Sequence, residues 1–258
     1  MVSGSTAIVT GGGRGIGRAI CRALAAEGTN VVIADIDAEE MAETAELVEA
    51  EGVRAHTIQT DLRSFEDVES TVDEALAEFE TIEILVNNAG IAGPTAECES
   101  VDPDDWDQTL AVNLRGPFYM CRQVLPAMKE QSYGRIVNIA SVTGKRPLTQ
   151  RLPYATTKMG LIGFTRTLSA EVGKHDINVN AICPGSVDGP RIKRVFEAKA
   201  EASGRTYEAV RGDAEAESPR NELVQKEDIA GVVAFLCSED ANRITGQDIN
   251  VSAGKVMY

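Results

Sequence analysis

Tyr154 and Lys158 are the residues whose types and spacing point most directly to chemistry. They lie four positions apart at the start of a predicted helix, so their side chains emerge on one face, a single turn apart. A free tyrosine has a pKa of about 10, but a cation a few ångströms away favours the phenolate. The pair predicts a phenol that exchanges a proton with a substrate oxygen, although an isolated Tyr and Lys at this spacing also fit a solvated helix face.

Two further polar residues favour the catalytic interpretation. Ser141 follows the predicted strand 135–139, so its hydroxyl lies at a strand's carboxyl end, where such a donor holds a substrate oxygen and stabilises charge developing on it. Asn113 lies in the apolar segment 110–114, so its amide needs a partner, either a water leading toward Lys158 or its own helix. We therefore expect Asn113, Ser141, Tyr154 and Lys158 to form the catalytic group.

A glycine-rich segment follows the first predicted strand, since residues 10–17 are TGGGRGIG. Glycines let the backbone approach a pyrophosphate, and the helix that begins there offers unpaired N–H groups. The spacing is not G-x-G-x-x-G, and taken alone the segment also fits a plain turn. Asp35, however, ends the second predicted strand eighteen residues after Gly17. This is close to the interval of about 20 residues at which an acidic residue binds the ribose hydroxyls of a dinucleotide.

Arg14 and Asp35 make opposite predictions about the dinucleotide. A basic residue in the glycine loop suits the 2′-phosphate of NADP, whereas the carboxylate of Asp35 repels it. Two like charges about 4 Å apart cost on the order of 4 kcal/mol at an effective dielectric constant near 20, roughly a thousandfold in affinity. The sequence therefore favours NAD as the cofactor over NADP.

The composition excludes several classes of partner and site. Asp and Glu number 40 against 25 Lys and Arg, a formal charge of −15, so a nucleic acid or an acidic lipid surface is not expected as a partner. No run approaches the roughly 18 apolar residues of a membrane span, and residues 1–10 lead into a strand pattern rather than a signal peptide. Five scattered cysteines and two separated histidines indicate reduced thiols and no metal site. We expect a soluble, cytoplasmic protein.

The acidic surplus also raises the question of salt. Lysine is scarce, and an acid-rich, lysine-poor surface suits a high-salt cytoplasm, where screening weakens its self-repulsion. A halophilic protein and an ordinary acidic one fit this composition equally well.

Short β-branched runs alternate with helical patterns along the chain. Strands are predicted at 7–10, 31–35, 54–59, 82–87, 135–139 and 178–182, with amphipathic helices at 38–51 and 64–80. This alternation predicts a single-domain α/β fold over 1–258, a Rossmann-type doubly wound parallel sheet with helices on both faces. The Pro- and Gly-rich stretch 185–221 is expected to be an irregular, mobile insertion that covers the substrate.

Together these motifs resemble the short-chain dehydrogenase/reductase family. The resemblance covers essentially the whole chain and comprises TGGGRGIG at 10–17, NNAG at 87–90, Asn113, Ser141, YATTK at 154–158 and PG at 184–185. It implies Tyr154 as acid/base, Lys158 lowering its pKa and holding the nicotinamide ribose, Ser141 orienting the carbonyl and Asn113 in a proton relay. The residues expected to bind the cofactor are Gly11, Arg14, Gly15, Ile16, Gly17, Asp35, Asp61, Leu62, Asn88, Ala89, Gly90, Tyr154, Lys158, Pro184, Gly185 and Val187.

The resemblance also implies a last strand at 246–251 and a homo-oligomer. Members of the family are often tetramers built on two long helices, which here correspond to 107–131 and 153–173. The expected activity is hydride transfer between NAD and a secondary alcohol or ketone, such as a sugar, polyol or hydroxy acid. The alternatives are an NADPH-dependent 3-oxoacyl reductase, which Arg14 suits, and a regulatory protein that senses the dinucleotide.

Substrate choice is expected to lie with 91–97, 142–151 and the insertion after Gly185. Three basic residues, Lys145, Arg146 and Arg151, lie close in sequence to the catalytic Ser and Tyr. They weakly favour an anionic or polyhydroxylated substrate, although solvated loop charges account for them more simply.

Overall fold

A computed structural model describes residues 4–258 and shows one seven-stranded sheet in this range. All strand pairs are parallel, and the order across the sheet is β3-β2-β1-β4-β5-β6-β7. The strands are β1 (Thr6–Thr10), β2 (Asn30–Asp35), β3 (Ala55–Gln59), β4 (Ile84–Asn87), β5 (Gly134–Ile139), β6 (Ile177–Pro184) and β7 (Asp248–Val251). The predicted doubly wound α/β fold is confirmed, and each predicted strand differs from the observed one by at most two residues at either end. Residues 1–3 of the predicted amino-terminal segment lie outside the described residues.

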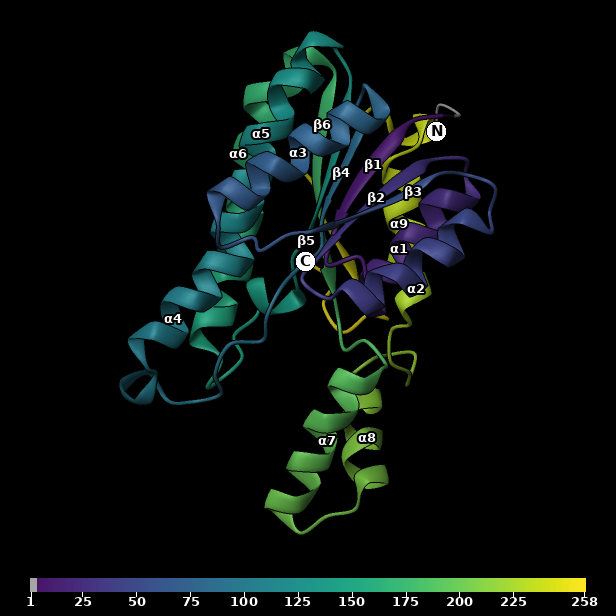
Figure 1. The fold of residues 1–258 in the computed structure, drawn as a ribbon. Helices are drawn as coiled ribbons and strands as arrows, with labels where there is room; N and C mark the ends of the chain where they lie inside the picture. Colours follow the sequence, from purple (N-terminus) through teal and green to yellow (C-terminus); the bar gives the residue numbers. More distant parts are fainter. Residues whose placement is uncertain (1–3) are drawn as a thin grey trace.

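Helices cover both faces of the sheet, as Figure 1 shows with α3, α5 and α6 on one side and α1, α2 and α9 on the other. The α-helices are α1 (Gly15–Ala26), α2 (Ala38–Glu49), α3 (Phe65–Phe79), α4 (Pro103–Leu110), α5 (Gly116–Glu130), α6 (Leu152–Val172), α7 (Pro190–Ser203), α8 (Tyr207–Ala216) and α9 (Lys226–Leu236). Short 3₁₀ turns lie at Cys98–Ser100, Val142–Gly144, Gly173–His175 and Glu239–Ala241.

The helix starts follow from their capping residues. The Asp37 side chain accepts a hydrogen bond from the Glu40 amide at the start of α2, and the Ser64 hydroxyl accepts one from Asp67 at the start of α3. At α9, Gln225 and Asp228 form a reciprocal capping box. Each cap satisfies an amide that the first helical turn leaves without a partner.

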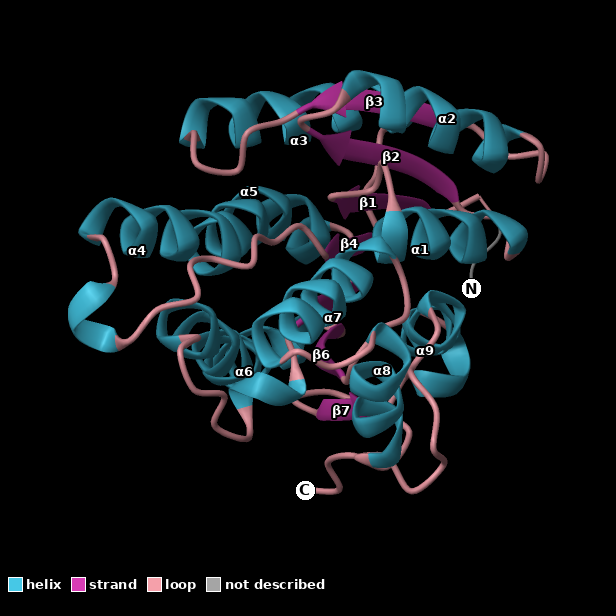
Figure 2. Cartoon of the chain, turned by 90° about the horizontal axis from the view of Figure 1, so that it is seen from below, coloured by secondary structure: helices cyan, strands magenta, loops and turns pink. Residues whose placement is uncertain are grey.

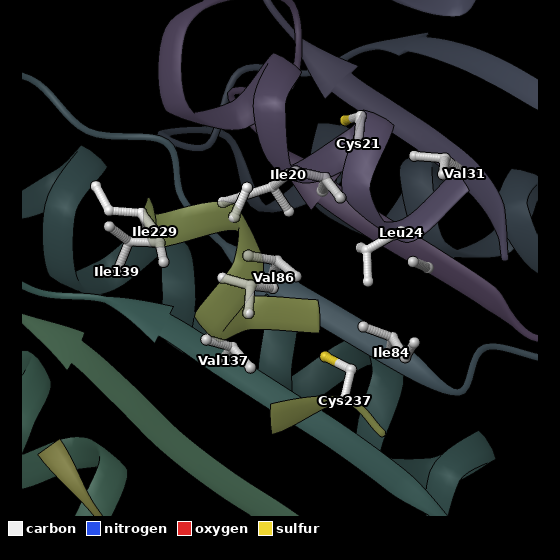
Figure 3. Close-up of a cluster of buried hydrophobic side chains, with 14 of the residues drawn as sticks. Ile20, Cys21, Leu24, Val31, Ile84, Val86, Val137, Ile139, Ile229 and Cys237 are labelled. Carbon is white, nitrogen blue, oxygen red and sulfur yellow. The ribbon is translucent and has the colours of Figure 1, made fainter. Parts of the chain in front are cut away.

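Two apolar cores lie on the two faces of the sheet. One joins α1, α2 and α9 to the sheet, and Figure 3 shows Ile20 and Leu24 of α1 gathered with Val86 of β4, Val137 of β5 and Ile229 of α9. The other joins α3, α5 and α6 to the opposite face, with Val68, Met120 and Leu168 among its members. Strands buried on both faces contain continuous apolar runs, as β1 and β4 do, which makes them recognisable in the sequence.

The predicted long helix 107–131 is interrupted. The helix α4 begins earlier, at Pro103, and a π-helical turn over Ala111–Arg115 separates it from α5. A π-turn accommodates one extra residue without breaking the apolar stripe, so the periodicity gave no sign of it. Asn113 lies in this turn. The other long helix, α6, agrees closely with the predicted range 153–173.

The insertion is helical rather than irregular. The helices α7 and α8 form a hairpin that projects beyond the body of the molecule, and Figure 2 shows it in front of β6. Phe196 and Ala200 of α7, Val210 of α8 and Leu223 give the hairpin a small core of its own. Pro190 and Gly204 lie at the two ends of α7 and so do not break it, whereas Gly212 lies within α8.

No helix within residues 4–258 is both long and apolar enough to cross a membrane.

Candidate active site

The residues predicted to be functional gather at the carboxyl ends of the strands. The glycine loop follows β1, Asp35 ends β2, Asn88 to Gly90 follow β4, Ser141 follows β5, and Gly185 follows β6. Because all strands are parallel, these segments meet along one edge of the sheet, where ligands of such folds bind. The hairpin α7–α8 extends beyond this same edge.

The glycine loop approaches the segment after β4 too closely for side chains. Gly11 has φ +63°, and a Cβ added there would lie 2.8 Å from the Cα of Ala89. A Cβ at Gly17 would collide with the Gly11 carbonyl oxygen. Gly15, at φ +57°, faces open space. The side chain of Arg14, the N-cap residue of α1, does not cap the amides of the first helical turn. Uncapped amides beside an open loop fit the pyrophosphate of a dinucleotide.

Thr10 links the two segments that form this cradle, and it was not among the predicted site residues. Its hydroxyl accepts hydrogen bonds from the amides of Asn88 and Ala89, both at 3.1 Å. The side-chain amide of Asn88 returns two bonds, to the carbonyls of Thr10 and Gly11, both at 2.9 Å. The threonine of the TGGGRGIG motif was the available signal, because a hydroxyl at a buried strand end must find partners.

Asp35 is held in place from both sides. Its Oδ2 accepts from the Gly13 amide at 3.0 Å and its Oδ1 from the Ile36 amide at 2.7 Å, so the carboxylate lies against the glycine loop. Arg14 is exposed. Arg18 is the engaged arginine of this region, because it donates to the Gly13 carbonyl at 2.8 Å and pairs with Glu40 at 2.7 Å.

Tyr154 and Lys158 lie on one face of the first two turns of α6. The Lys158 Nζ lies 5.6 Å from the centroid of the Tyr154 ring and donates to the Ile139 carbonyl at 2.8 Å. Lys158 is only 4% exposed, so its charge acts in a poorly solvated place. The backbone of Gly144 packs against Lys158 so closely that a Cβ at Gly144 would lie 2.8 Å from the Lys158 carbonyl carbon. The turn Val142–Gly144, which follows Ser141, therefore packs directly against α6.

Asn113 is completely buried and joins this turn of α6 to the loop after β4. Its Oδ1 accepts from the Ile91 amide at 2.8 Å, and its Nδ2 donates to the Ile91 carbonyl at 2.9 Å and to Thr157 Oγ1 at 3.3 Å. These partners lie outside its own helix, on the loop after β4 and on α6. The Thr157 hydroxyl in turn donates to the Tyr154 carbonyl at 2.8 Å.

Ser141 ends the site on the β5 side and is 8% exposed. Its Oγ accepts a hydrogen bond from the Thr143 amide at 3.1 Å, which leaves the hydroxyl hydrogen to donate elsewhere. Behind it, burial raises the pKa of the Cys183 thiol to about 11, although Lys145 acts in the opposite direction. Cys183 is therefore a neutral thiol at physiological pH.

The remaining predicted cofactor residues lie around the same edge. Asp61 and Leu62 follow β3, and a hydrogen bond from Arg63 lowers the pKa of the Asp61 carboxyl. Pro184 ends β6, the Gly185 amide donates to the Val251 carbonyl at 2.9 Å, and Val187 forms a parallel bridge with Val224. The structure thus brings the predicted cofactor residues to one edge of the sheet.

The three basic residues near Ser141 and Tyr154 are bound to protein groups. Lys145 pairs with Asp248 at 2.8 Å, and Arg146 lies 3.6 Å from Glu217. Arg151 donates to the Ala92 carbonyl at 2.6 Å. None of the three is simply a solvated loop charge, and their partners weaken the sequence-based hint of an anionic substrate.

The fold and the glycine loop at the carboxyl edge of the sheet define a dinucleotide-binding protein, and the comparisons identify its family. The family model described as "short chain dehydrogenase" matches residues 5–200. A D-beta-hydroxybutyrate dehydrogenase of Cupriavidus necator is 35% identical over 261 residues, covering 99% of each chain.

Two solved structures share the fold closely. An NAD+-bound xylitol dehydrogenase has a TM-score of 0.93 at 32% identity, covering 98% of this chain and 99% of the other. An actinorhodin polyketide ketoreductase variant with NADPH has a TM-score of 0.94 at 34% identity, covering 100% of both chains.

The chain belongs to the short-chain dehydrogenase family, as the sequence motifs predicted. It is an oxidoreductase that acts on alcohol or ketone groups and uses a nicotinamide dinucleotide.

Proposed function

We propose that this protein is an NAD-dependent dehydrogenase of a secondary alcohol, with Asn113, Ser141, Tyr154 and Lys158 as its catalytic group. The observation that carries the proposal is the arrangement on α6, where the Lys158 ammonium lies 5.6 Å from the Tyr154 ring centroid beside the end of β5. Binding a dinucleotide alone, as a sensor does, requires the glycine loop and Asp35 but not this pair.

In the oxidative direction Tyr154 takes the hydroxyl proton of the alcohol. A nicotinamide dinucleotide held by the glycine loop and Asp35 would supply the acceptor for the hydride of the same carbon, which would become a carbonyl. Ser141 donates a hydrogen bond to the substrate oxygen and stabilises the charge that develops on it. Lys158 favours the phenolate of Tyr154 and would bind the nicotinamide ribose, and Asn113 takes part in a proton relay.

The preference for NAD rests on Asp35. Its carboxylate is fixed against Gly13, so it receives ribose hydroxyls well and repels a 2′-phosphate. The exposed Arg14 supports the alternative, an NADPH-dependent ketoacyl reductase, and the NADPH-bound ketoreductase of the same fold makes that alternative worth testing.

The test is NADH formation with secondary alcohols, sugars, polyols and hydroxy acids, with NADP in parallel. We expect activity with NAD and a loss of about a hundredfold or more in Tyr154→Phe, because proton transfer by a positioned side chain contributes at least this much. Phenylalanine keeps the ring, and Tyr133→Phe, far from the site at the other end of β5, is the matched control. Dinucleotide binding without turnover of any substrate would favour the alternative of a dinucleotide-sensing regulatory protein. Turnover with NADPH alone would favour the ketoacyl reductase.

We further propose that the protein works in the cytoplasm as a homotetramer, and that the hairpin α7–α8 covers the substrate. We also propose a high-salt host, which the protein's surplus of acidic residues fits as well as it fits an ordinary acidic protein. The same assay in low and molar potassium chloride tests the proposal of a high-salt host. Full stability and activity without added salt would contradict that proposal.

A further inference from the structure

Arg151, the residue immediately before α6, contacts both the catalytic tyrosine and the loop after β4. Its guanidinium carbon lies 5.4 Å from the Tyr154 ring centroid, and the Lys158 ammonium lies 5.6 Å from the same centroid. Both distances are within the range in which a cation is attracted to an aromatic ring. The ring of Tyr154 therefore has two cations within this range.

The same guanidinium is hydrogen-bonded to the loop 91–97. One terminal nitrogen donates to the Ala92 carbonyl at 2.6 Å, and the other donates to Thr95 Oγ1 at 3.3 Å. The neighbouring Gln150 contributes two bonds, since its carbonyl accepts from the Ala96 amide and its side chain donates to Glu97, both at 3.0 Å. A planar, forked guanidinium can hold two points of a loop at once, which a lysine ammonium does less well.

The other end of the loop is fixed by Asn113, which binds both backbone groups of Ile91. Between the two anchors, Gly93 lies against α4, where an added Cβ would come 2.7 Å from Thr109 Oγ1. The loop is thus attached to the catalytic helix through Asn113 and Thr157 at one end and through Arg151 at the other. Arg151 therefore connects the loop to the side of α6 that carries Tyr154.

We propose that Arg151 is a positioning and specificity-determining residue, which fixes the loop 91–97 as a rigid wall of the substrate pocket beside Tyr154. This rests on the proposed function, because it assumes that the substrate lies against Tyr154. Since both terminal nitrogens of Arg151 bind the loop, the residue selects substrates through the shape of this wall.

The test compares Arg151→Met, which keeps the apolar stem, with Arg151→Lys. The matched control is Gln150→Ala, because Gln150 binds the same loop from the neighbouring position. In the ligand-free protein, hydrogen exchange should speed up in 91–97 by about tenfold in the methionine variant, the equivalent of about 1.4 kcal/mol, and not elsewhere. The lysine variant should be intermediate, and Gln150→Ala should change exchange less, because the Gln150 carbonyl stays in place.

The kinetic half of the test separates KM from kcat. In Arg151→Met the KM for the alcohol should rise by about tenfold, with a changed ratio of kcat/KM between a small and a bulky alcohol, while the Kd of NAD changes little. Unchanged exchange and KM, or faster exchange throughout the protein, would overturn the proposal. If the unmodified protein turns over no alcohol, the proposed function fails, and the exchange data still decide whether Arg151 holds the loop.

Discussion

At the residue scale, Asp35 is the position on which cofactor discrimination depends. Replacing it with alanine removes a carboxylate that lies 3.0 Å from the Gly13 amide and would face the 2′-phosphate of NADP. We expect Asp35→Ala to shift the ratio of kcat/KM between NAD and NADP toward NADP by about tenfold or more, because even a screened repulsion of about 1.4 kcal/mol has this effect. Steady-state kinetics with both cofactors measure the ratio.

The control is Asp37→Ala, which removes a nearby carboxylate that only caps α2. It should lower stability and leave the cofactor ratio unchanged. An unchanged ratio in Asp35→Ala would mean that Arg14 or another group sets the preference.

The sequence identifies a functional residue when its partners lie close to it along the chain, and misses its role when the partners are distant. Tyr154 and Lys158 are readable because helix geometry alone puts them on one face. Arg151 was noticed only as a charge, because its partners Ala92 and Thr95 lie more than fifty positions away in a loop without periodicity. The same holds for Asn113, whose need for a partner was predictable, whereas its bonds to Ile91 depend on a tertiary contact.

At the element scale, the edge strand β7 is tied to the site by charges. Asp248, its first residue, pairs with Lys145 at 2.8 Å and with Arg166 of α6 at 2.8 Å. Partial burial raises the pKa of the Asp248 carboxyl, but the hydrogen bonds from Lys145 and Arg166 outweigh it and hold the pKa below its usual range. The charged carboxylate therefore joins the edge of the sheet to α6 and to the turn after Ser141.

This ion pair predicts a pH-dependent contribution to stability. A folded-state pKa below the unfolded value stabilises the protein above the ordinary carboxyl pKa of about 4, and the contribution disappears as the pH falls through the lowered value. Asp248→Asn should lower the free energy of unfolding by about 2 kcal/mol at neutral pH, because Lys145 loses its charged partner in a poorly solvated place.

Denaturant unfolding from neutral to acidic pH measures this difference, which should shrink as the pH falls below about 4. Asp73→Asn, at an exposed carboxylate of α3, is the control and should change stability little. A constant difference at all pH values would show that Asp248 acts through packing rather than charge.

The elements themselves were predictable where period and capping agree, as in α2 and α3. The insertion was not, because its prolines and glycines look like loop signals although Pro190 opens α7 and Gly204, in the left-handed conformation, ends it. Composition alone does not reveal whether such residues interrupt a helix or bound one.

At the scale of the whole molecule, the face formed by α5 and α6 carries exposed apolar side chains among charged ones. Between α5 and α6 a groove of about 450 Å³ is lined by Phe118, Leu125, Phe164 and Leu168, and Phe118 and Phe164 also line a second groove of about 910 Å³ toward α4. Phe118 is 44% exposed and Met159 of α6 54% exposed. The sequence could name the helices of a subunit interface only through the family resemblance, since a stripe such as Leu161, Phe164 and Leu168 fits a core equally well. Its ends, Leu161 and Leu168, are in fact buried.

The proposed tetramer makes this face an interface between subunits. In a symmetric contact between two copies, each residue occurs once in each subunit. A charge introduced at Phe118 therefore places two like charges near each other, on a surface that is desolvated when the subunits associate. We expect Phe118→Asp to break the interface and to yield dimers or monomers by light scattering after size exclusion, while the circular dichroism of the fold is retained. Leu47→Asp, which introduces the same charge on the 37% exposed Leu47 of α2 across the sheet, should leave the mass unchanged. A Phe118→Asp variant that is still a tetramer would show that the subunit contacts lie elsewhere. If the unmodified protein is a monomer, the proposed tetramer is wrong, whereas the proposed catalytic group is unaffected.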